Sequence, residues 1–311
     1  MPEITLELLN DAANMEARSK RTEEVIDAAT GNPEELLRFI FRYASWNGYF
    51  GSGVATLAGK IGRCRGLFLD TKHDFGFGFT GPDGPTFGAL KDRSVLVASH
   101  VFDAARDEFN DRDTMWRDTH RCLAQATVIG TAQFLRPHFF PKRRDMSPFT
   151  DDSVSASRIG RILREPLWLQ GLNDRVAQGY GSGTPDDGPS VFHAMGFHLG
   201  SELLADQEFS LIDEALRATQ PDLVAHLENT TINIGGQDHN AYYWIRIHSG
   251  HGGGVEAEHF DAAMESVRLA FQYTSDRQRD AFRHQLMLGF KRFATDQDEF
   301  FEHVNDPDRN H

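Results

Sequence analysis

Cysteine is scarce in this sequence, since Cys64 and Cys122 are the only two among 311 residues and they stand far apart. They cannot form a disulfide framework or a cysteine-based zinc or iron–sulfur site, which favours a reducing compartment. Long apolar runs are missing too, which argues against a helical membrane span. Residues 1–5 lack the basic and apolar regions of a signal peptide. We therefore expect a soluble cytoplasmic protein.

Positive charge is also in deficit, because 46 Asp and Glu outnumber 32 Lys and Arg and leave a formal net charge of −14. A basic surface is the electrostatic requirement for binding nucleic acid or an anionic membrane. The sequence therefore excludes both partners, and solubility is the simplest reason for the acidic excess.

Apolar residues recur near the helical period of 3.6 along most of the chain, and no segment alternates with period two for long enough to predict a sheet. The pattern predicts an all-α, single-domain helical bundle. Residues 1–32 form a helical or irregular extension, 33–295 the bundle with its site, and 296–311 an acidic tail. A glycine-rich segment, 64–91, is expected to be a surface or lid loop. The helices are expected at residues 33–63, 93–109, 114–136, 153–163, 167–178, 191–216, 238–248, 255–273 and 276–293, with a short helix that starts at Pro221.

The most informative stretch begins at His248, continues through three consecutive glycines and re-enters a helical pattern at Val255. In that pattern Glu256 and His259 share one helix face. A carboxylate and an imidazole on the apolar side of a helix require a partner, because burying an unpaired charge is costly. A bound metal ion is one such partner.

Other helices carry matching residues. Glu108 and His120 flank a short acidic turn, and His198 and Glu202 share a helix face with Asp206 one turn further on. Carboxylates with a few imidazoles on facing bundle helices are typical of di-iron and di-manganese sites. Taken singly, Glu108 could be a solvated acid and His120, His198 and His248 could be structural histidines.

The order of these segments resembles that of the haem-oxygenase-like di-metal oxidases and oxygenases. The similar segments are Phe41–Phe50, Asp107-Glu108 with His120-Arg-Cys-Leu123, Gly196–Glu202, and Tyr243–His248 with Glu256-Ala-Glu-His259. The resemblance implies a haem-oxygenase-like bundle with Fe(II)/Fe(III), two ions per chain, or manganese. The implied metal ligands are Glu108, His120, Glu202, Glu256 and His259, with His198, Asp206, His248 and Arg246 as neighbours. The family pattern includes a further carboxylate from the first aromatic helix, which residues 36–63 do not supply.

The function implied by the resemblance is O2-dependent oxidation of a small amine, amino acid or related metabolite by N-oxygenation, desaturation or C–C cleavage. The partners are then the small substrate, O2 and an external electron donor, and a homodimer is one assembly that the apolar stripes allow. Arg246 could bind a substrate carboxylate, or form a surface ion pair. The alternatives are a haem-oxygenase- or TenA-like enzyme without a di-metal site, and a non-enzymatic helical binding protein.

Overall fold

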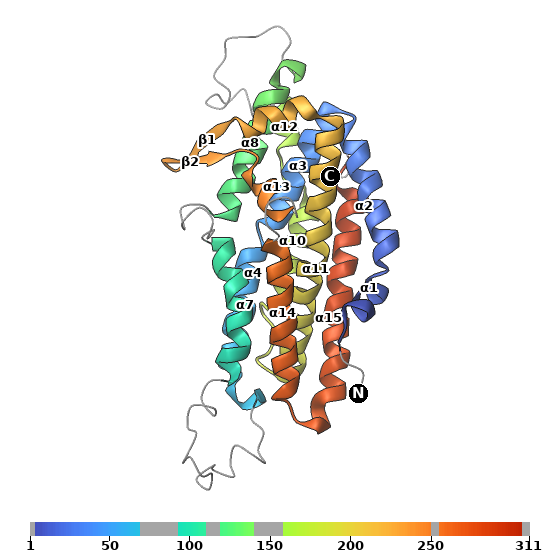
Figure 1. Cartoon of the computed structure of the whole chain (residues 1–311), viewed down its shortest axis with the longest axis vertical. Coiled ribbons are helices and arrows are strands. Elements are labelled where there is room, and N and C mark those ends of the chain that lie inside the picture. Colours follow the sequence, from blue (N-terminus) through green and yellow to red (C-terminus); the bar gives the residue numbers. More distant parts are fainter. Residues whose placement is uncertain (1–3, 69–92, 110–118, 140–157, 250–254, 307–311) are drawn as a thin grey trace.

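Two long helices, α11 (Gly188–Thr219) and α15 (Asp276–His303), run side by side in the same direction along the axis of the fold (Figure 1). Gly196 and Gly289 lie where they cross, and a Cβ added at either would stand 1.8 Å from the carbonyl oxygen of Leu286 or His193. Only glycine allows backbones to approach so closely. The close packing of α11 against α15 therefore requires glycine at positions 196 and 289.

The computed structural model describes residues 4–68, 93–109, 119–139, 158–249 and 255–306, with the side chains of Arg65, Arg158, Asp206, Val255 and Glu256 left outside the described part. The remaining elements, in chain order, are α1 (Leu6–Ala13), α2 (Met15–Thr30), α3 (Pro33–Asn47), α4 (Phe50–Arg63), η1 (Arg65–Phe68), α7 (Arg93–Phe109), α8 (His120–Phe139), α9 (Arg158–Ile162), α10 (Leu167–Gly179), α12 (Pro221–Glu228), β1 (Thr231–Ile234), β2 (Gln237–Asn240), α13 (Tyr243–His248) and α14 (Val255–Gln272). The expectation of an all-α protein is confirmed. Of the expected lid loop, 64–91, the segment Arg65–Phe68 forms the short helix η1, and residues 69–91 lie outside the described residues.

The helices are arranged so that several ends meet near the middle of the bundle (Figure 1). α14 runs antiparallel to α11 and α15, α4 packs against α7, and α8 continues beyond the end of α7. Local signals set several starts. The Asn32 side chain accepts from the backbone N–H of Glu34, with Pro33 in the first turn, and Asp187 caps α11 by accepting from Ser190.

The expected single helix over 33–63 is wrong, because α3 ends at Asn47 and α4 begins at Phe50. The Gly48 N–H still bonds to the carbonyls of Ala44 and Ser45, so the chain turns without losing its hydrogen bonds. The apolar period continues through the break because both helices face the same core, so periodicity alone could not reveal it.

The expected helix over 238–248 is also wrong in its first half, because β2 occupies residues up to Asn240 and pairs with β1 as an antiparallel hairpin. Gly235 and Gly236 form its two-residue turn with φ of +63° and +87°. A Gly-Gly pair is a favoured hairpin turn because both positions need positive φ. The dipeptide after Thr-Ile-Asn-Ile was therefore the signal that the helical interpretation missed.

At the C-terminal end, α15 extends through His303, beyond the expected end at residue 293 and into the expected acidic tail. Phe300 and Val304 are fully buried there. Arg42 of α3 donates to the carbonyl oxygens of Val304 and Asp306 at 2.8 and 3.0 Å. The acids of this segment had suggested a solvated tail, but ion pairs such as Arg175–Asp296, at 3.1 Å, compensate them. α8 likewise continues to Phe139, past the predicted end at Pro137.

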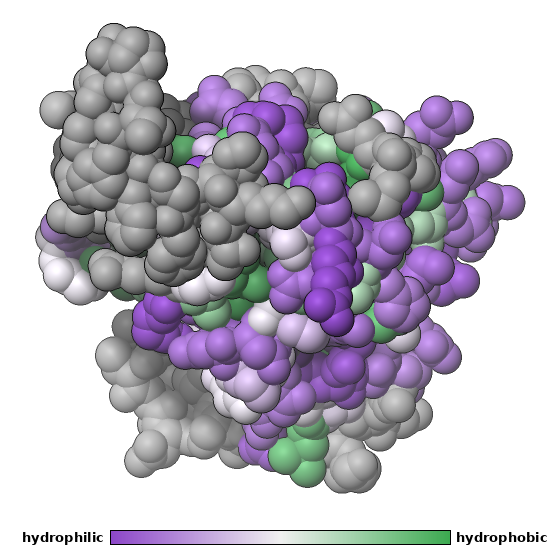
Figure 2. Space-filling model, turned by 90° about the horizontal axis from the view of Figure 1, so that it is seen from below, coloured by the Kyte–Doolittle hydropathy of each residue, from purple (hydrophilic) through white to green (hydrophobic). Residues whose placement is uncertain are grey.

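The coloured part of the surface at the lower end of the bundle is mainly hydrophilic with separate apolar patches (Figure 2). Within the described residues, no helix combines the length and the apolar character needed to cross a membrane.

Candidate metal centre

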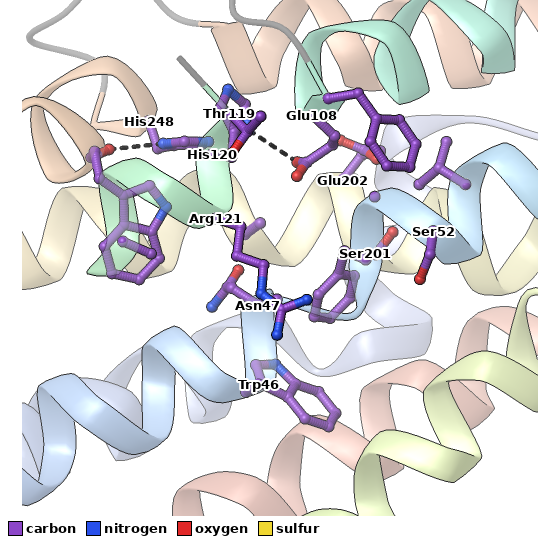
Figure 3. A pocket seen from close by; sticks show the side chains of 18 of the residues that line it. Trp46, Asn47, Ser52, Glu108, Thr119, His120, Arg121, Ser201, Glu202 and His248 are labelled. Atoms are coloured by element: carbon purple, nitrogen blue, oxygen red, sulfur yellow. Dashed lines mark hydrogen bonds and ion pairs between the residues drawn. The ribbon is translucent and has the colours of Figure 1, made fainter. Parts of the chain in front are cut away.

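Glu108 and His120 meet where α7 ends and α8 begins, with Nδ1 of His120 3.1 Å from Oε1 of Glu108. His248 joins them from α13, and its ring centroid lies 4.5 Å from that of His120 in an edge-on arrangement (Figure 3). One carboxylate oxygen and one nitrogen from each imidazole lie within 4.8 Å of one another. These three residues, from three helices, are called the Glu108 cluster below.

His248 is held in the form that can bind a metal. Its Nδ1 lies 2.7 Å from the carbonyl oxygen of Trp244, one helical turn earlier. A carbonyl only accepts hydrogen bonds, so Nδ1 carries the proton and Nε2 keeps its lone pair. Burial, reinforced by the neighbouring His120, lowers the pKa of His248 to about 3, which keeps the ring neutral. A neutral imidazole oriented by a carbonyl is the usual state of a metal-bound histidine.

A second group surrounds Glu202 on α11. Oε1 of Glu202 lies 3.1 Å from Nδ1 of His198 on the same helix, and Oε2 lies 3.6 Å from Nδ1 of His259 on α14. The other nitrogen of His259, Nε2, lies 3.4 Å from Oδ2 of Asp107 on α7. All four side chains are buried. They are called the Glu202 cluster below.

The charges of the two clusters influence one another. Burial alone would raise the pKa of Glu108 and of Glu202, but nearby imidazoles outweigh it and lower both, chiefly His120 for Glu108 and His198 for Glu202. Burial would lower the pKa of His259, but the hydrogen bond with Asp107 and the charges of Glu202 and Glu108 raise it. The carboxylates therefore favour the ionised form and attract positive charge to the space between them.

Both clusters border a cavity of about 280 Å³, to which Glu108, His120, His248 and Glu202 all contribute. Figure 3 shows these side chains on one side of it and Trp46, Asn47 and Arg121 on the other. The further lining residues are Gly48, Phe50, Gly51, Ser52, Val54, Phe109, Thr119, Ala124, Ser201, Ala205, Glu208, Trp244 and Phe293. The cavity therefore combines an aromatic wall with a wall of acids and imidazoles.

Gly51 of α4 lets that helix approach the Glu108 cluster. A Cβ added at Gly51 would stand 2.9 Å from Cβ of Glu108, closer than real Cβ contacts. The glycine therefore leaves the room in which the Glu108 side chain lies against α4.

The residues present fit one or two hard or borderline metal ions. Every donor is a carboxylate oxygen or an imidazole nitrogen, which suits iron and manganese. Two ligands about 2.1 Å from one ion lie at most about 4.2 Å apart, so small side-chain rotations would bring the Glu108 cluster onto one ion. In the Glu202 cluster, Nε2 of His198 is buried with no hydrogen-bond partner in the described part of the chain. An imidazole nitrogen of this kind requires a partner.

The structure brings together Glu108, His120, Glu202 and His259 from the predicted ligand set, with His198 and His248 in direct contact with them. The side chains of Glu256 and Asp206 lie outside the described part of the chain. Arg246 is exposed, lies 5.0 Å over the Tyr243 ring and does not border the cavity.

Three residues that sequence reasoning did not select belong to this region: Asp107, Arg121 and Glu208. Asp107 was visible only as the neighbour of Glu108. Arg121 follows His120 within a segment that carries the resemblance but was not itself selected, and Glu208 stands in no recognisable motif.

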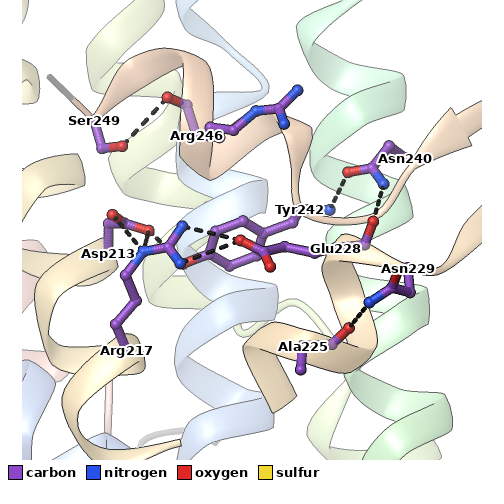
Figure 4. A network of polar contacts seen from close by, with 9 residues as sticks. All are labelled: Asp213, Arg217, Ala225, Glu228, Asn229, Asn240, Tyr242, Arg246 and Ser249. Carbon is purple, nitrogen blue, oxygen red and sulfur yellow. Dashed lines mark hydrogen bonds and ion pairs between the residues drawn. The ribbon is translucent and has the colours of Figure 1, made fainter. Parts of the chain in front are cut away.

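The helix that carries His248 is anchored to α11 by polar contacts around a buried carboxylate (Figure 4). The Tyr242 hydroxyl, just before α13, donates to Oδ1 of Asp213, which is fully buried. Arg217 donates to the same carboxylate at 3.0 Å and to Glu228 of α12 at 3.1 Å. Because a buried carboxylate needs such partners, the network holds the start of α13 at one place on α11.

No known protein family matches the sequence, and neither the curated proteins nor the solved structures include one with significant similarity to the chain.

Proposed function

We propose that this chain is an O2-dependent non-haem di-iron oxidase or oxygenase with a haem-oxygenase-like bundle. Its substrate is a small amine, amino acid or related metabolite, and the reaction is N-oxygenation, desaturation or C–C cleavage. The observation that carries the proposal is the approach of two carboxylate–imidazole clusters to one cavity, from α7, α8, α11, α13 and α14. Buried charged groups in such numbers are costly unless they bind something.

The two clusters take separate parts in metal binding. Glu108, His120 and His248 would hold one ion, while Glu202 and His259 would hold the other with His198 beside them. Asp107 orients His259 through its second ring nitrogen, as carboxylates commonly do for metal-bound histidines. Glu256, implied by the resemblance, remains a further candidate ligand.

When bound, two Fe(II) ions supply two electrons for the reduction of O2, and the substrate or an external donor supplies the other two. The protein positions the substrate and excludes water. Trp46, Phe50, Trp244 and Phe293 give the cavity an apolar wall, which limits the water near the reacting atoms. Manganese is the alternative metal, and a cytoplasmic location and a homodimer complete the proposal.

The test is an anaerobic Fe(II) titration of the metal-free full-length chain, followed by mixing with O2 under stopped-flow absorbance. About two equivalents of bound iron and an O2-dependent absorbance change support the proposal. Both should be lost in Glu202→Ala and His259→Ala, and both should remain in Glu214→Gln, an exposed acid on the same helix as Glu202.

Iron binding that is unchanged in both Glu202→Ala and His259→Ala would contradict the proposal. A chain that binds haem but not Fe(II) would point to a haem-oxygenase-like enzyme instead. A chain that binds neither haem nor Fe(II) would favour a binding protein.

A further inference from the structure

Glu208 is a buried acid that borders the cavity but belongs to neither cluster. It lies on α11 beyond Glu202, with Ala205 between them on the cavity wall. Both of its carboxylate oxygens accept hydrogen bonds, one from the Tyr43 hydroxyl at 2.8 Å and the other from the Gln297 side-chain amide. Two neutral donors hold the carboxylate in place without compensating its charge.

No side-chain cation forms an ion pair with Glu208 among the described residues. Arg18 acts on it only through its more distant charge, because the Arg18 guanidinium pairs with Asp298 at 2.7 Å and donates to the carbonyl oxygen of Ala294. Burial accordingly raises the pKa of Glu208 to about 7. Burial therefore disfavours the ionised form of Glu208, and a cation that enters the cavity would favour it.

The aromatic wall of the same cavity is suited to such a cation. Two indoles and two phenyl rings border it, and π faces attract ammonium groups electrostatically, most strongly when water is excluded. Trp46 and Phe50 lie edge to face with centroids 5.5 Å apart, and Phe50 and Phe293 do so at 5.8 Å. The four rings are those of Trp46, Phe50, Trp244 and Phe293.

We propose that Glu208 and these four rings form a subsite for the ammonium group of a small primary amine. Ionised Glu208 supplies the counter-charge, the rings supply a cation-attracting wall, and the cavity of about 280 Å³ admits only a short chain. That this amine is the substrate of an oxidation rests on the proposed function. The subsite itself does not, because it lies outside the metal clusters.

The test measures binding of butylammonium, butan-1-ol and butyrate to the full-length chain by isothermal titration calorimetry, both metal-free and loaded with Mn(II). The three probes have the same chain length and differ in charge. Butylammonium should bind at least about tenfold more tightly than butan-1-ol, as expected for one charge-assisted hydrogen bond in a dry site. Butyrate should bind less tightly than butylammonium, because Glu108, Glu202 and Glu208 border the cavity and repel its carboxylate.

The variants are Glu208→Gln and the matched control Glu214→Gln, whose residue is exposed on the same helix. Glu208→Gln should lose the preference for the amine over the alcohol, and Glu214→Gln should keep it. Equal affinity of the wild-type protein for the amine and the alcohol would overturn the proposal. Amine binding by Glu208→Gln that is as tight as in wild type would also overturn it.

Failure of this subsite and failure of the di-iron proposal give different results. Binding of iron without amine selectivity removes the subsite alone. Amine selectivity in a chain that binds no iron removes the di-iron function and leaves an amine-binding cavity.

Discussion

Asp107 and Glu108 are adjacent in α7, yet their carboxylates reach different histidines. Oδ2 of Asp107 lies 3.4 Å from Nε2 of His259, and Oε1 of Glu108 lies 3.1 Å from Nδ1 of His120. Successive side chains on a helix point about 100° apart, so one turn of α7 can serve two neighbouring clusters. The pair therefore links the Glu108 and Glu202 clusters through the backbone of a single helix.

Asp107→Asn should weaken metal binding by about 10- to 100-fold without unfolding the chain, because an amide orients His259 less well than a carboxylate does. Competition with a metal-binding dye measures the affinity. Asp103→Asn on the same helix is the control, since that side chain is 57% exposed. Equal affinities in both variants would remove Asp107 from the metal centre.

Gly51→Ala should also weaken metal binding, because the new Cβ stands 2.9 Å from Cβ of Glu108 and displaces that side chain. Gly59→Ala, on the same helix, meets only the end of the Arg63 side chain at 3.5 Å. The control should keep its metal affinity and gain about 0.5–1 kcal/mol of stability from the helix preference of alanine. Metal titration and thermal unfolding of both variants check this, and an unaffected metal affinity in Gly51→Ala would show that α4 does not constrain Glu108.

Glu208 should make the stability of the metal-free protein fall as pH rises. Its pKa is raised from 4.5 to about 7 in the folded chain, so the folded state holds a proton that the unfolded state releases. The resulting loss of unfolding free energy is absent below about pH 4.5, grows between pH 4.5 and 7, and reaches about 3 kcal/mol above pH 7.

Urea unfolding of wild type and Glu208→Gln from pH 4.5 to 8.5 measures this effect. The unfolding free energy of the variant minus that of wild type should rise by about 3 kcal/mol from pH 4.5 to 8.5. This rise is expected whatever the difference between the two proteins is at pH 4.5. A constant difference would mean that Glu208 is ionised throughout.

Arg121 should select ligands that carry a carboxylate as well as an amine. It borders the cavity, and among the described residues no acid forms an ion pair with it. A guanidinium binds a carboxylate through two parallel hydrogen bonds, so 4-aminobutyrate should bind about tenfold more tightly than butylammonium.

Arg121→Ala should lose that advantage and Arg246→Ala should keep it, because Arg246 lies over Tyr243 away from the cavity. Calorimetry with the two ligands gives the comparison. An advantage lost in Arg246→Ala instead would favour the alternative in which Arg246 binds the substrate carboxylate.

Particular residues show how far prediction from sequence extends. Acids and imidazoles on helix faces made Glu108, His120, Glu202 and His259 candidates, and the resemblance implied them as ligands. The structure brings these four side chains together. The break at Gly48 and the hairpin turn at Gly235 were missed. In both places the apolar pattern of the neighbouring segments was compatible with a continuous helix, and the local backbone decided otherwise.

By itself, the sequence determined the helical class, most helix positions and the kind of donor groups, because periodicity, caps and residue chemistry are local properties. Only the tertiary structure decided that Asp107 contacts His259, that Glu208 shares a cavity with Glu202, and that Arg121 rather than Arg246 borders it. These contacts join residues far apart in the chain, and they depend on how α7, α8, α11, α13 and α14 pack. No local pattern carries that information.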